Sequence, residues 1–162
     1  MSLMPLIRIL AVVVGLVGLS CLFPLFVALG LGEREVVPAF LIPVAIGVVA
    51  SLFVFLVRSK RQSSIGIRTA FFGVAFSWIV ACLIGSIPLI VSGAVSSYID
   101  AFFESVSGFT TTGATVISGL DSLPRSINLW RCQTHWLGGM GIVVLTVAIT
   151  PLLGVGGFYI VK

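Results

Sequence analysis

Four long apolar runs dominate this chain, at roughly residues 6–31, 37–57, 69–91 and 127–153. Each is near or above the ~20 residues that a helix needs to cross a bilayer. The composition agrees, because 59% of the residues are hydrophobic and only 9% are charged, whereas about a quarter is charged in ordinary soluble domains. The sequence therefore predicts an all-α integral membrane protein that is surrounded by lipid.

Basic residues gather in the segment between the second and third runs, at Arg58, Lys60, Arg61 and Arg68. Because Lys and Arg near span ends resist translocation, this loop is predicted to be cytoplasmic, with Arg8 and the N-terminus on the same side. The net charge of +4 arises from this clustering and does not indicate a nucleic-acid partner. The first run is too long for the apolar part of a cleaved signal peptide, so we expect a retained helix in a multi-pass protein of the cytoplasmic membrane.

A fifth apolar run, about residues 97–107, is too short to span a bilayer. At ~1.5 Å per residue, a helix there reaches roughly 16 Å, about half of the hydrocarbon core. Ser96 and Ser97 offer hydroxyl N-caps, and Asp100 follows in the first turn. A Thr- and Gly-rich stretch, residues 110–115, comes directly after it. This order predicts a pore helix that enters the membrane and returns through a non-helical loop.

Non-helical backbone at membrane depth is tolerated only where protein buries it or where it lines a watery cavity. The hydroxyls of Thr110, Thr111 and Thr112 add oxygen ligands to the backbone carbonyls, and Gly113 is free of the restriction that a Cβ imposes. Such oxygens suit a hard monovalent cation. We therefore expect these four residues to bind an ion in a selectivity filter. The alternative, a buried turn capped by Thr, leaves a half-length helix between two full spans unexplained.

The stretch FESVSGFTTTGAT from Phe103, then Trp130-Arg131 and WLGGMGI from Trp136, resembles the membrane subunits of Trk-type potassium uptake systems, the TrkH family of the Trk/Ktr/HKT superfamily. The resemblance covers essentially the whole length, with strong motifs from about residue 100 to 157. It implies an N-terminal helix pair, residues 1–61, followed by one span–pore loop–span repeat, residues 62–162. Family members continue through three more repeats, and the four loops form one filter. The resemblance therefore implies that this chain is the N-terminal part of such a subunit.

The same resemblance implies a function and a set of partners. The function is potassium uptake across the inner membrane of a bacterium, with the potassium ion as substrate, no cofactor and no enzymatic activity. The partners are the remaining repeats, a second copy in a homodimer, and a cytoplasmic nucleotide-binding regulatory subunit of the TrkA type. One departure is His135, where the family pattern has Gln; a lone His at the end of a span is expected to be a structural hydrogen-bonding residue.

Glu104 is an acid within the predicted pore helix, and intramembrane acids are functional candidates by default. The residues leave open whether its carboxylate supports the filter backbone from behind, attracts cations, or pairs with Arg131 or Arg125. We assign Glu104 and Arg131 to filter support.

Several smaller features are expected to have structural rather than functional roles. Pro24 and Pro43 lie within apolar runs and are able to kink them. The three cysteines lack metal-ligand spacing and are expected to be small buried hydrophobic residues. The glycines at 138, 139 and 141 are expected to serve helix packing rather than bending.

Two rival functions remain open at this point. In an intramembrane serine hydrolase, Ser105 or Ser107 would be the nucleophile and His135 the base, but this leaves the Thr and Gly run unused. Alternatively, the chain is a truncated membrane protein that folds without conducting ions, because one loop offers only a fraction of the oxygen ligands that a dehydrated ion requires.

Overall fold

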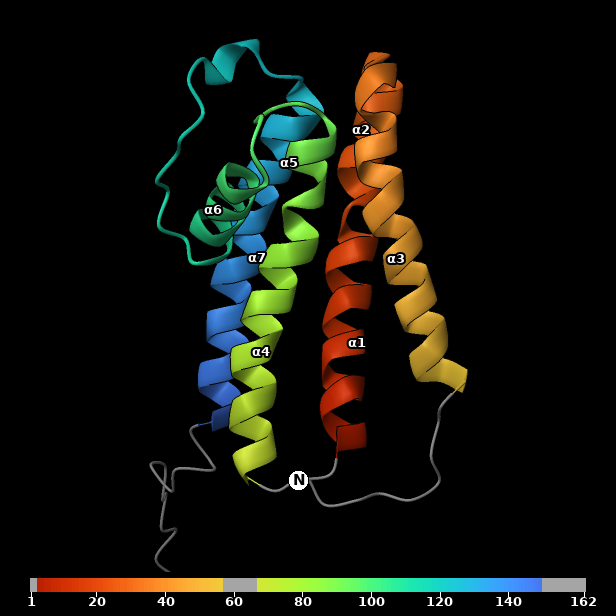
Figure 1. Cartoon of the computed structure of the whole chain (residues 1–162), viewed down its shortest axis with the longest axis vertical. Coiled ribbons are helices and arrows are strands. Elements are labelled where there is room, and N and C mark those ends of the chain that lie inside the picture. Colours follow the sequence, from red (N-terminus) through yellow and green to blue (C-terminus); the bar gives the residue numbers. More distant parts are fainter. Residues whose placement is uncertain (1–2, 57–66, 150–162) are drawn as a thin grey trace, which may run out of the picture.

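The computed structural model describes residues 3–56 and 67–149, and most of these residues are helical (Figure 1). No strand occurs in this described part of the chain. The elements in order are α1 (Leu3–Ser20), α2 (Leu22–Leu31), η1 (Arg34–Val36), α3 (Val37–Leu56), α4 (Ile67–Gly85), α5 (Ile87–Val91), α6 (Tyr98–Phe109), η2 (Leu120–Ser122) and α7 (Arg125–Ile149).

The long helices run alternately up and down in Figure 1, with α1 and α2 rising, α3 descending, α4 and α5 rising and α7 descending. The short α6 lies in the upper half of the view, and the chain after it returns to the top before α7 begins. Three stretches of the described residues are long and apolar enough to cross a membrane: Met4–Leu31, Arg34–Leu56 and Phe71–Val91. The fourth predicted span corresponds to α7, which is 25 residues long but is not among those three.

The short helix expected over about residues 97–107 is present as α6, which has 12 residues against the 18 to 20 of α1, α3 and α4. The predicted boundary between residues 61 and 62 lies outside the described residues, as does most of the basic loop.

Two of the predicted spans are not single helices, and both breaks lie just before a proline. The first run breaks at Cys21, between α1 and α2, and the third breaks at Ser86, between α4 and α5. Proline has no N–H, so Pro24 cannot bond to the Ser20 carbonyl four residues earlier. Pro43 removes a bond in the same way, yet α3 continues through it.

Small residues bring α1 and α3 into backbone contact. A Cβ added at Gly18 would lie 2.4 Å from the Pro43 carbonyl oxygen and 2.7 Å from the Gly47 Cα, and one added at Gly15 would lie 2.5 Å from the Ser51 hydroxyl. The backbone atoms of Pro43 and Gly47 leave no room for a side chain at Gly18, and such close approach is typical of helices packed within membranes. The N-terminal helices are therefore held together by close backbone approach.

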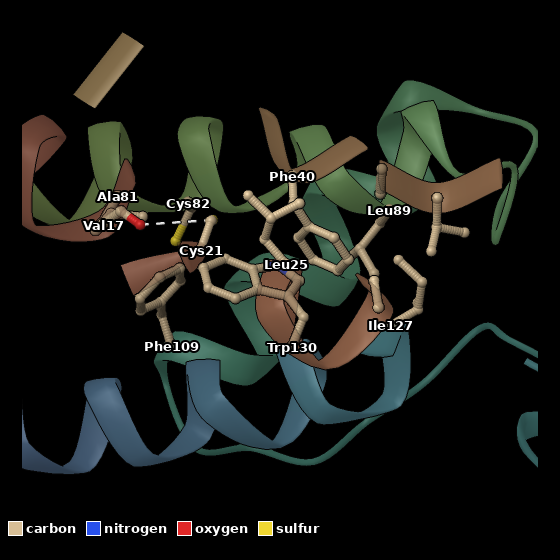
Figure 2. Packing of buried hydrophobic residues seen from close by; sticks show 13 residues of the cluster. Val17, Cys21, Leu25, Phe40, Ala81, Cys82, Leu89, Phe109, Ile127 and Trp130 are labelled. Atoms are coloured by element: carbon tan, nitrogen blue, oxygen red, sulfur yellow. Dashed lines mark hydrogen bonds between the residues drawn. The ribbon is translucent and has the colours of Figure 1, made fainter. Parts of the chain in front are cut away.

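The buried core lies where the helix breaks meet α7 (Figure 2). Trp130 is fully buried and points from α7 toward Cys21 and Leu25. Cys21 and Cys82 are buried, as predicted, but the prediction was wrong for Cys132, which is exposed. Cys132 lies two residues after Trp130, on a different face of α7, and helical periodicity turns it away from the core.

Candidate functional site

The site begins with α6, whose ends are defined by local hydrogen bonds. The Ile99 amide donates to the Ser97 hydroxyl at 3.2 Å, so Ser97 is the N-cap, as the sequence predicted. At the other end, the Thr111 amide donates to the Gly108 carbonyl and the Thr112 amide to the Ser107 carbonyl, both at 2.9 Å. This is the pattern of a Schellman motif, which ends a helix with a left-handed residue.

The left-handed residue of this motif is a threonine. Thr111 has φ 57°, and it is the only non-glycine residue with positive φ in the described part of the chain. A β-branched residue in that region is a conformational outlier. Gly113 follows with φ 78°, and no atom outside its two chain neighbours lies within 4 Å of the position its Cβ would take. The loop therefore turns twice within three residues, and one of the turns is made by a strained threonine.

The consequence is a set of unpaired carbonyls over residues 110–113. Within the described residues, none of these four backbone carbonyls accepts a hydrogen bond, whereas the next one, of Ala114, accepts from the Ser107 hydroxyl at 2.6 Å. The Thr110 and Thr112 hydroxyls lie 2.8 Å apart, and all four residues are exposed. Four adjacent exposed residues thus have backbone carbonyls that accept no hydrogen bond within the described part of the chain.

Glu104 holds the loop from behind. Its carboxylate is buried, with Oε1 accepting from the Thr115 hydroxyl at 2.5 Å and from the Val116 amide at 2.6 Å. The other oxygen, Oε2, accepts from Nε and Nη2 of Arg131 at 3.2 and 3.1 Å. The loop contact and the Arg131 pair, which the sequence left as alternatives, therefore coexist on separate oxygens.

The C-terminal half of α6 is seated on α7 through glycines. A Cβ at Gly138 would lie 2.0 Å from the Phe109 carbonyl oxygen, and one at Gly108 would lie 2.2 Å from the Thr134 hydroxyl. Helix α7 runs unbroken past Gly138, so packing, rather than bending, is the role that the structure gives this glycine. His135 places Nδ1 2.8 Å from the Arg131 carbonyl within its own helix, as expected of a structural hydrogen-bonding residue.

Glu33 was not predicted to take part in this site, yet it holds the start of α7. Its carboxylate accepts from the Arg125 amide at 2.8 Å and from the Ser126 amide at 3.1 Å, and also from the Ser126 hydroxyl. Partial burial alone would raise the pKa of Glu33, but the hydrogen bonds from Ser126 and Arg125 and the charge of Arg125 outweigh it, so the pKa is lowered. An anion at a helix N-terminus is stabilised by the free amides there.

Two side chains of α7 were also missed, and both bind carbonyls at the helix breaks. Gln133 Nε2 donates to the Ser20 carbonyl at 2.8 Å, and Trp130 Nε1 donates to the Gly85 carbonyl at 2.9 Å. The Ser20 carbonyl is the one that Pro24 leaves without an amide donor. Pro24 indicated in the sequence that the Ser20 carbonyl would lack its helical donor. The side chain that supplies the donor, Gln133, lies 113 residues after Ser20.

The geometry does not favour a hydrolytic dyad. The Ser107 hydroxyl donates to the Ala114 carbonyl, the buried Ser105 hydroxyl has no hydrogen-bond partner, and His135 is bonded within α7. Neither serine is hydrogen-bonded to His135 in the described residues. Those residues also contain no group of three His, Cys, Asp or Glu side chains able to hold a metal ion.

Comparisons with known proteins agree with these features. Residues 37–162 match the family model described as TrkH: Cation transport protein. The chain is similar to the Trk system potassium uptake protein TrkH of Halomonas elongata, with 44% identity over 97% of this chain and 33% of the relative, and to that of Escherichia coli K12, with 41% identity over 96% and 32%. It thus spans about a third of the length of these curated relatives.

A solved structure shows the same fold. The crystal structure of the potassium transporter TrkH from Vibrio parahaemolyticus matches with a TM-score of 0.85 and 38% identity, over 99% of this chain and 34% of that one. The family match, the identities and the structural agreement together show that the chain belongs to the TrkH family of cation transport proteins.

Proposed function

We propose that residues 110–113 supply one quarter of a potassium-selective filter in a Trk-type uptake system of the bacterial inner membrane. The observation that carries this proposal is the row of four exposed residues whose carbonyls accept no hydrogen bond from the described chain. In a membrane such carbonyls need a partner, because each unsatisfied group costs several kcal/mol. A dehydrated potassium ion is a partner of the right chemistry.

Potassium coordination requires more than one loop. A cation that has shed its water must regain its ligands from a ring of oxygens, and one loop provides only part of that ring. The filter is therefore completed by three equivalent loops, which in the family belong to further repeats of the same subunit. The exposed face of residues 110–113 is the surface that these loops cover.

Glu104 and Arg131 act as the filter support. Because Arg131 neutralises the buried carboxylate, Glu104 contributes geometry rather than a net negative charge toward the ion. Its other oxygen fixes the Thr115 hydroxyl and the Val116 amide, immediately after the free carbonyls. Glu104 and Arg131 therefore fix the position at which the loop leaves the filter. This role requires no cofactor.

The membrane orientation follows from the charge distribution. We place the N-terminus and the basic loop in the cytoplasm, and η2 outside, since basic loops are retained inside. A second copy of the subunit and a cytoplasmic TrkA-type regulatory protein are the partners that the family favours. A cysteine introduced in place of the exposed Ser122, with the native cysteines removed, should react with an impermeant thiol reagent in intact cells; protection there would contradict this orientation.

The proposal is tested by a chimera in which this chain replaces the matching third of the Escherichia coli relative. Expressed in a strain without its own potassium uptake systems, the chimera should restore growth at low potassium and take up rubidium. Residues 1–162 expressed alone should not. A chimera that reaches the membrane but takes up no rubidium contradicts the proposed function, and rescue by the chain alone would show that copies of this unit assemble into a pore.

A further inference from the structure

We propose that the N-terminal helix pair positions the filter, acting through α7, and that Glu33 and Gln133 are the two positioning residues. This inference rests on the proposed function of residues 110–113. It gives a role in ion selection to helices that contribute no filter residue.

One stripe of α7 faces the N-terminal helices. Ser126 and Gln133 are seven residues apart, which places them on the same side of a helix, two turns from one another. Ser126 is bound by Glu33 in the loop between α2 and α3, and Gln133 donates to the Ser20 carbonyl at the break between α1 and α2. The helix pair therefore holds α7 at two heights, through its N-terminus and about two turns further along.

A second stripe of α7 faces the pore helix and its loop. Arg131, Thr134 and Gly138 follow the spacing i, i+3, i+7, which defines a different side of the same helix. Arg131 pairs with Glu104, while Thr134 and Gly138 lie against the last turn of α6. Neither Gly108 nor Gly138 leaves room for a Cβ against the facing helix, so α6 and α7 pack closely and a shift of α7 is expected to move α6.

These two stripes connect the helix pair to the filter. Arg131 lies between Ser126 and Gln133 in sequence, so a displacement of α7 at either residue also moves Arg131. Arg131 forms the ion pair with the Glu104 carboxylate. Glu104 in turn holds the Thr115 hydroxyl and the Val116 amide, directly after the free carbonyls. Because selectivity depends on the placement of those carbonyls, a small displacement is expected to change ion affinity.

The test uses the chimera described above and measures rubidium uptake kinetics. Glu33→Gln keeps the size of the side chain but removes the carboxylate, and Gln133→Leu removes the donor to Ser20. Each should raise the KM for rubidium about threefold to tenfold, the change expected from losing one hydrogen-bonded tie. Vmax per folded transporter, with the amount determined by size-exclusion chromatography of a fluorescent fusion, should change less than KM. Glu35→Gln is the matched control, because Glu35 is an exposed acid two residues away, and it should leave KM unchanged.

A double variant separates positioning from simple stability. In Pro24→Ala/Gln133→Leu, the new amide at position 24 is able to satisfy the Ser20 carbonyl without any contact to α7. Thermal stability should recover in this variant while KM remains raised. Recovery of KM together with stability would overturn the inference, as would a Glu33→Gln chimera that behaves like the Glu35→Gln control. Failure of the unsubstituted chimera to take up rubidium would instead contradict the proposed function itself.

Discussion

The N-terminal helices α1 and α3 and the later pair α6 and α7 are held together by different interactions. Helices α1 and α3 meet through glycine backbones, with Gly18 and Gly47 in direct contact. Helices α6 and α7 meet through glycines as well, but they add a buried ion pair, Glu104 with Arg131, that also binds the loop. Close packing suffices to hold α1 against α3. A loop with free carbonyls needs directional bonds, because packing alone does not fix the orientation of a peptide group.

The largest effect is expected from breaking the ion pair. Glu104→Ala leaves the Arg131 guanidinium mostly buried without its anion, and it also frees the Thr115 hydroxyl and the Val116 amide. We expect a loss of about 3–5 kcal/mol of stability, as for other buried pairs that lose one partner. Thermal unfolding of the purified protein in detergent measures it. Asp100→Asn, one turn earlier on the same helix, should cost far less, and equal losses for the two variants would contradict the role given to Glu104.

The next effect tests the glycine contact of the N-terminal helices. At an exposed helical position, Gly→Ala stabilises by roughly 1 kcal/mol. Gly30→Ala should do so, because nothing lies within 4 Å of the added Cβ. Gly18→Ala should instead destabilise by about 1–3 kcal/mol, since its Cβ would lie 2.4 Å from the Pro43 carbonyl oxygen. The opposite signs are the prediction, and a stabilised Gly18→Ala variant would show that α1 and α3 are not in backbone contact.

A smaller effect is expected where the two regions meet. Gln133→Leu leaves the Ser20 carbonyl without a donor, which should cost about 1–2 kcal/mol. Adding Pro24→Ala should regain most of this loss, because an amide then replaces the lost donor. Additive effects of the two substitutions would show that Gln133 does not compensate for Pro24. A double-mutant cycle on thermal unfolding measures the coupling.

The smallest effect concerns pH. Because the pKa of Glu33 is lowered on folding from its ordinary value of 4.5, its contribution to stability is fully present above that value and is lost as pH falls through the lower folded pKa. Melting temperatures measured from about pH 6 down to about pH 3.5 should therefore fall more steeply for the unsubstituted protein than for Glu33→Gln. Glu35→Gln should retain the slope of the unsubstituted protein; a Glu33→Gln variant with that same slope would refute the assignment.

Local features were predictable from the sequence. The start of α6 at Ser97 and its short length depend on residues within a few positions of each other, so capping rules and run lengths were sufficient. Pro24 likewise indicated a weakened helix, although the break at Cys21 also depends on the hydrogen bond that Gln133 of α7 donates to the Ser20 carbonyl. Pro43 was expected to act in the same way, but α3 continues through it.

Long-range pairings were not predictable. Glu33 binds Ser126 over 93 residues of sequence, and a sequence shows an acid in a loop without showing which helix N-terminus it meets. The sequence also could not decide whether Glu104 holds the loop or pairs with Arg131. Both occur, because the two oxygens of its carboxylate bind different partners. The exposure of Cys132 depends on which face of α7 meets the core, and the general tendency of cysteine to be buried does not reveal that face.

Substitution of Gly113 in the chimera tests the proposal that residues 110–113 line a potassium filter. Gly93 is a matched control, because it also has positive φ, 73° against 78°, and also has no atom within 4 Å of its Cβ position. Both Gly→Ser variants therefore carry similar backbone strain, but only Gly113→Ser alters the filter. Gly113→Ser is expected to weaken the preference for rubidium over sodium at least about tenfold, while Gly93→Ser should leave it unchanged. Unchanged selectivity in a folded Gly113→Ser transporter, or an equal loss in both variants, would contradict the claim.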